Sequence, residues 1–170
     1  MRSTRDRSLL NGRGKVNNLR PIRQMQEDPD VTQTLPAFTA QDALVAVMVA
    51  VSVSDETIRT AELLAIERQV NHLPVFAAYD ADRIREVAQT VYQLIEEEDG
   101  LDTLFAMVRD ALPERLNETA YALACDVAVA DVRLGQSELQ LLQELREELD
   151  IDRLHAAAIE WGARVRHITA

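Results

Sequence analysis

From about residue 39 onward, apolar residues return every three or four positions, the spacing typical of amphipathic helices. Residues 80–98 show it well, with an apolar stripe made by Ile84, Val87, Val91 and Leu94. We predict seven helices and no strand: residues 39–54, 59–71, 80–98, 101–112, 113–130, 136–149, and a last helix from 150 or 152 through Val165. The chain has only five glycines and five prolines, which also favours long helices joined by few turns.

The second prediction is an internal repeat. A shift of 76 residues places Ala43–Glu62 on Thr119–Glu138, so that each unit has an apolar helix, an Asp-x-x-(Ile/Leu)-x-x-x-Glu segment and an amphipathic helix. The Val-rich stretch Ala43–Val51 alone would also fit a strand, but its Ala-rich partner favours helix. Helices that are apolar nearly all round are normally buried. The fold class we predict is therefore all-α, a compact bundle of about seven helices with two pseudo-symmetric halves.

Charge divides the chain differently. Residues 1–24 carry a net charge of +6, so the remaining 146 residues carry -17. Residues 1–38 show no sustained periodicity, and we interpret them as a flexible basic N-terminal tail ahead of a domain at 39–170. The acidic body repels nucleic acid and anionic membranes and favours cations and basic partners. Only the Arg-rich tail has the charge to contact nucleic acid, and we prefer to interpret it as a tail exposed to solvent without such a contact.

The sequence lacks the features that are typical of several classes of protein. The single cysteine, Cys125, permits no intrachain disulfide and lies in an apolar run, where a core residue is expected. Apolar runs of about ten residues are too short to span a bilayer, and the N-terminus lacks the apolar region of a signal peptide, so we expect a cytoplasmic protein. No phosphate loop, nucleophile elbow or paired metal-binding histidines occur. His72, His155 and His167 stand alone, where surface or rim positions are expected, and Trp161 is expected in the core.

Five acidic residues occupy unusual positions. Glu62 and Glu138 continue the apolar stripes of their helices, Asp55 and Asp131 follow the two apolar helices, and Asp126 is the only charged residue within Ala120–Ala130. In one account they are structural: the acids cap or turn the chain, and Asp126 caps a neighbouring helix or pairs with an arginine. In the other, Asp126, Asp131 and Glu138 form one cation cluster, with Asp55 and Glu62 as the other half, and bind Ca²⁺ or Mg²⁺. Spacing favours the structural account.

The segment Val129–Glu138, an Ala-Asp pair after an apolar helix and a Glu that opens a Leu-rich helix, resembles the signature of the tellurite-resistance TerB family. Val53–Glu62 resembles it less closely, and the likeness covers residues 40–166. The resemblance implies an all-helical fold with pseudo-twofold halves, an acidic metal-binding patch, and a role in tellurite and other stress responses. The family usually has Gly after the Asp, whereas Glu56 and Val132 stand here. Ala50 also replaces the aspartate of the second half, so that half is the better candidate for a metal site.

We therefore expect a non-enzymatic TerB-like module that binds either a divalent cation or a protein partner through its acidic centre. The alternatives are a purely structural adaptor, whose acids only cap helices and whose surface recruits other proteins, and a metal-dependent hydrolase that activates a metal-bound water.

Overall fold

The computed structural model describes residues 38–53, 60–130 and 135–168, without the side chains of residues 60–62. All of these residues belong to the second of two units of the chain, Leu35–Ala170. Residues 1–37 of the predicted tail lie outside the described residues, as do Asp55 and Asp131.

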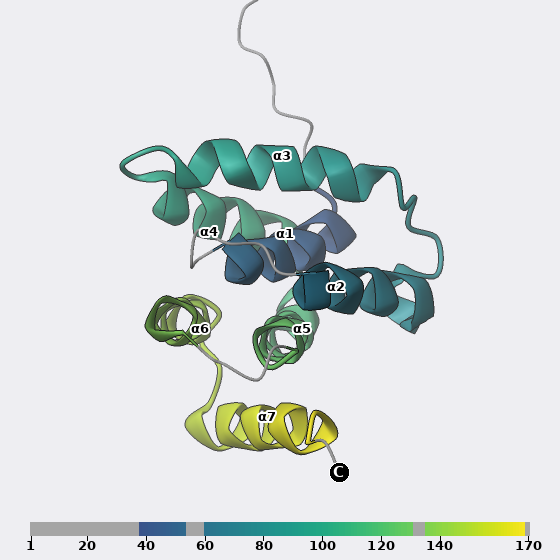
Figure 1. Ribbon diagram of the computed structural model, residues 1–170. Coiled ribbons are helices and arrows are strands. Elements are labelled where there is room, and N and C mark those ends of the chain that lie inside the picture. Colours follow the sequence, from purple (N-terminus) through teal and green to yellow (C-terminus); the bar gives the residue numbers. More distant parts are fainter. Residues whose placement is uncertain (1–37, 54–59, 131–134, 169–170) are drawn as a thin grey trace, which may run out of the picture. The chain divides into compact units, whose positions relative to one another are not determined.

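The described residues form seven α-helices, and they contain no strand, which confirms the predicted fold class (Figure 1). The helices are α1 (Ala40–Val53), α2 (Thr60–His72), α3 (Arg83–Ile95), α4 (Gly100–Ala111), α5 (Asn117–Ala128), α6 (Gln136–Glu148) and α7 (Arg153–Arg166). Two short 3-10 helices, Pro74–Phe76 and Glu114–Leu116, precede α3 and α5. The helix predicted from residue 113 thus begins as a 3-10 turn, because Pro113 holds extended backbone there.

The two apolar helices lie at the centre. Helix α1 packs most extensively against α5, and its residues from Asp42 to Val53 are all buried (Figure 1). On α5, Tyr121, Leu123 and Val127 are buried against the same core. The Val-rich stretch is therefore a helix, as its Ala-rich partner indicated.

The internal repeat is visible in the helix boundaries and in the packing. A shift of 76 residues moves the bounds of α2 onto those of α6, and it moves α1 to within one residue of α5 at each end. Helix α1 packs against α2 and α3, and α5 packs in the same way against α6 and α7. Each half therefore consists of a central helix with two flanking helices.

Helix α4 breaks this symmetry. It lies against α1, α3 and α6, and it follows α3 directly in the chain. Among the described helices, only α5 packs closely on α7. The second half therefore has no described helix in the place that α4 takes in the first half.

None of the described helices is long and apolar enough to cross a membrane.

Candidate functional site

Asp126 lies on the side of α5 that faces α7. Its Oδ1 accepts a hydrogen bond from the Arg166 guanidinium near the end of α7, and its side chain is 22% exposed. Pairing with an arginine is one of the roles foreseen in the structural account. A carboxylate already held by a guanidinium is a poor ligand for a cation, because the two positive charges compete for the same oxygens.

Glu138 lies in the first turn of α6 and is fully buried. Its Oε2 accepts a hydrogen bond from the Gly135 N–H, so the side chain caps its own helix, whereas the structural account gave it only a place at the positive end of the helix dipole. Its Oε1 has no hydrogen-bond partner among the residues that the structure describes. A buried carboxylate oxygen without a donor is costly, and this oxygen is the feature of the described residues most favourable to a cation.

The predicted cation cluster is only partly described. Glu62 lies in α2, but its side chain is outside the described residues, and so are Asp55 and Asp131. Within the described ranges, no three His, Cys, Asp or Glu side chains are grouped closely enough to hold a metal ion. The hollow that Asp126 lines is formed with residues of α2 and α7, and Glu138 is not part of its lining.

Sequence reasoning missed Asp42, the most strongly bonded acid of the described chain. This side chain is fully buried at the start of α1 and forms a bidentate ion pair with Arg83 of α3, through Nε at 3.0 Å and Nη2 at 2.7 Å. Tyr79 Oη donates a third bond at 2.9 Å, and Thr39 donates from both its N–H and its hydroxyl. The Thr39-x-x-Asp42 spacing of a capping box was the available signal.

The bonds to Asp42 also determine its ionisation. Burial opposes the charged form, but the hydrogen bonds from Arg83, Thr39 and Tyr79 outweigh it and lower the pKa from the usual 3.8 to about 2. The Asp42 carboxylate is therefore a charged anchor that joins α1 to the segment before α3 and to α3 itself.

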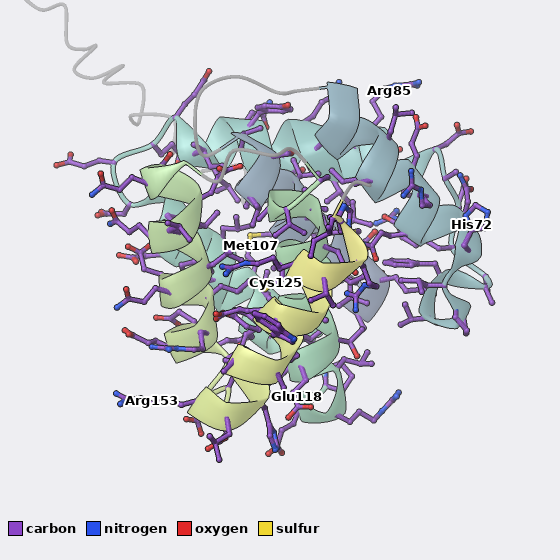
Figure 2. The ribbon with its side chains drawn as sticks, turned by 60° about the horizontal axis from the view of Figure 1, so that its bottom comes forward. His72, Arg85, Met107, Glu118, Cys125 and Arg153 are labelled. Atoms are coloured by element: carbon purple, nitrogen blue, oxygen red, sulfur yellow. The ribbon has the colours of Figure 1, made fainter. Side chains whose placement is uncertain are left out.

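A cleft of about 390 Å³ lies between α6 and α7, above α5. Tyr121 and Cys125 of α5 are among the residues that line it, and Cys125 is labelled in Figure 2. Tyr121 Oη donates to Glu160 Oε1 at 2.6 Å. Burial is the largest influence on Cys125 and raises the pKa of its thiol to about 12. The thiol thus stays protonated at neutral pH and is a poor nucleophile, and its burial confirms the prediction of a core cysteine.

A second groove, of about 480 Å³, lies between α2, α5 and α7. We call it the α2–α7 groove. Its lining is formed by Ala65, Arg68, Gln69, His72, Leu73, Asp126, Arg166 and His167. Two arginines and two histidines thus surround one aspartate, which is already paired with Arg166.

The most exposed large apolar side chains of the described residues lie on α7 and just beyond its end. Leu154 is 80% exposed, Ile168 71% and Trp161 64%, and Val165 lies between them. Our expectation that Trp161 belongs to the core is wrong, because α7 turns its small residues Ala156 and Ala163 toward α5 instead. The expectation for the histidines is confirmed: His72 and His155 are exposed, and His167 is partly exposed.

Comparisons of the chain with protein-family models, with characterised proteins and with solved structures gave no match. The TerB resemblance therefore stays a prediction carried by the sequence motif.

Proposed function

We propose that the chain is a cytoplasmic, non-enzymatic TerB-like module that acts by binding another protein. The observation that carries the proposal is the exposed apolar row along α7 and just past its end, formed by Leu154, Trp161 and Val165 of α7 and by Ile168. Soluble proteins seldom leave several large apolar side chains together in water, and such patches mark interaction sites. Tryptophan is also among the residues most enriched at the energetic centres of interfaces.

The row follows the geometry of a helix–helix contact. Within α7, Leu154, Ala158, Trp161 and Val165 are spaced by four, three and four residues, the spacing of a coiled-coil seam. Ala158 and Gly162 are small and allow another backbone to approach closely. These features support a helical element of a partner as the group that covers α7.

Photo-crosslinking tests this proposal. Benzoylphenylalanine at position 161 should capture a defined protein in the native cells, whereas the same group at Tyr92, a partly exposed aromatic of α3, should not. With the captured protein purified, Trp161→Ala should weaken its binding by at least about tenfold. The melting temperature should stay unchanged because Trp161 is largely exposed. Equal capture at both positions, or an unchanged affinity, would contradict the proposal.

Cation binding is the second candidate, and the unpaired Oε1 of buried Glu138 is the observation that favours it. Calorimetric titration of the full chain with Ca²⁺ or Mg²⁺ should show binding and a rise in melting temperature. Glu138→Gln should abolish both effects, and Asp131→Asn should weaken binding more than Asp55→Asn does. An absence of heat and of thermal stabilisation would eliminate this candidate and leave protein binding untouched.

A further inference from the structure

The packing leaves one place unfilled in the second half. Helix α4 lies against α1, α3 and α6, whose equivalents in the other half are α5, α7 and α2. These three helices line the α2–α7 groove. In Figure 1, α4 lies beside α1 and α3, while α5 lies between α2 and α7. The groove is thus the equivalent of the place that the start of α4 borders in the first half, where Leu101 lines a hollow with Ala50 and Leu141.

Burial along the two central helices supports this equivalence. Ala43, Ala46 and Ala50 on α1 are at most 2% exposed. A shift of 76 residues places them on Thr119, Ala122 and Asp126 of α5, all three of which are partly exposed. One side of α5 therefore lacks the cover that its equivalent has. The same difference explains why an aspartate is tolerated where α1 has Ala50.

The charge of the groove indicates what would cover it. Arg68 and His72 lie on α2, and Arg166 and His167 lie at the end of α7, while Asp126 is occupied by Arg166. Arg68 forms no ion pair with any described residue. The α2–α7 groove is therefore locally basic in a chain of net charge -11. Complementary charge favours an acidic partner and penalises a basic one.

Helix α4 shows what kind of element fits such a place. It packs Leu104, Phe105 and Val108 into the core, and it follows directly on the acidic run Glu96–Asp99. It is an amphipathic helix with an acidic N-terminal extension. An apolar face laid into a groove is a common mode of helix recognition.

We propose that the α2–α7 groove binds an acidic amphipathic helix of a partner protein, as α4 packs in the other half. This inference rests on the proposed role in protein binding but uses a different surface from the apolar row of α7, so the two can fail separately.

The probe is a helix-stabilised, fluorescent peptide with the sequence of residues 96–112 of this chain, titrated with the full-length protein. Fluorescence anisotropy should show saturable binding. Arg68→Glu should weaken it by at least about tenfold, because an attraction becomes a repulsion. Gln69→Trp should abolish binding by filling the groove. The matched control is Arg85→Glu, since Arg85 is an exposed arginine on α3, away from the groove that His72 lines (Figure 2).

Specificity has its own control. A peptide in which lysines replace residues 96–99 should bind at least about tenfold more weakly than the acidic peptide. The proposal is overturned by an absence of binding up to about 1 mM, by equal effects of Arg68→Glu and Arg85→Glu, or by equal binding of the two peptides. If the peptide fails while position 161 still captures a partner, only the groove is lost and the proposed function stands.

Discussion

Asp42 connects segments that lie about forty residues apart in the chain. Its carboxylate accepts bonds from Thr39 beside it and from Tyr79 and Arg83 near the start of α3. Since Asp42 is fully buried while Arg83 remains one-third exposed, the aspartate is the partner that depends on the pairing. Removing its charge leaves the guanidinium with only the exposed Glu86 carboxylate, 3.7 Å away, as a counter-ion at the edge of the core.

We expect Asp42→Asn to lower the free energy of unfolding by about 3 kcal/mol, the lower end for a broken buried ion pair, because Arg83 still reaches water. Urea unfolding at pH 7 measures the change. Asp82→Asn is the control, since Asp82 is exposed one residue before α3, and it should change stability by less than about 0.5 kcal/mol. Similar losses in both variants would show that the buried pair has no special role.

The same carboxylate predicts a pH dependence. Its folded pKa of about 2 lies below the unfolded value of 3.8, so the stabilisation is fully present above about pH 4 and disappears as the pH falls toward 2. The size of this contribution is about 2 kcal/mol. Urea unfolding from pH 5 to pH 2 should show a loss in the wild type that Asp42→Asn lacks. Parallel curves for the two proteins would contradict the assignment.

Single residues were the least predictable from the sequence. The burial of Cys125 followed from its apolar neighbours, and an arginine partner for Asp126 followed from the cost of burying a carboxylate. Which arginine pairs with it, Arg166, depends on how α7 packs on α5. The prediction that Trp161 lies in the core was wrong for a related reason. Hydrophobicity alone does not show which side of a helix faces the core when small alanines fill the inner face.

At the scale of helices, the turn between α3 and α4 shows how little space the first half leaves. A Cβ added to Gly100 would lie 1.5 Å from the Leu94 carbonyl oxygen, so the backbone itself would have to move. A Cβ added to Gly162 of α7 would meet only the flexible end of Arg166, at 3.3 Å. Replacing these two glycines by alanine should therefore change the stability of the protein in opposite directions.

We expect Gly100→Ala to destabilise the protein by more than about 2 kcal/mol through this clash. Gly162→Ala should instead stabilise it by up to about 1 kcal/mol, because alanine is the better residue inside a helix. Chemical denaturation of both variants measures the difference. A loss at Gly162 would mean that the bare backbone of α7 is needed in the free protein.

The helices themselves were predictable because their apolar periods are long and regular, as in α3. The internal repeat was needed to predict that α1 is a helix, because its valines alone fit a strand equally well. The α2–α7 groove was not predicted. No described helix of the second half takes the place of α4, and the mark that this difference leaves in the repeat, Asp126 at the position of Ala50, was interpreted as a candidate metal ligand.

For the whole molecule, the core is built within residues 40–163: α1 and α5 form its centre, and helices from both halves surround them. Deletion of residues 1–34 should therefore leave the helical content unchanged and shift the melting temperature by no more than about 2 °C. Circular dichroism of the shortened and full chains checks this. A collapse on deletion would make the basic N-terminal segment part of the fold.

The exposure of Trp161 has a spectroscopic consequence. It is the only tryptophan of the chain, and it is 64% exposed, so indole fluorescence comes from a residue already largely in water. Unfolding will therefore change the indole emission little. A thermal melt that is monitored by this emission will hardly report the loss of the core. A shift of the emission to shorter wavelength in the folded protein will instead report that something has covered α7.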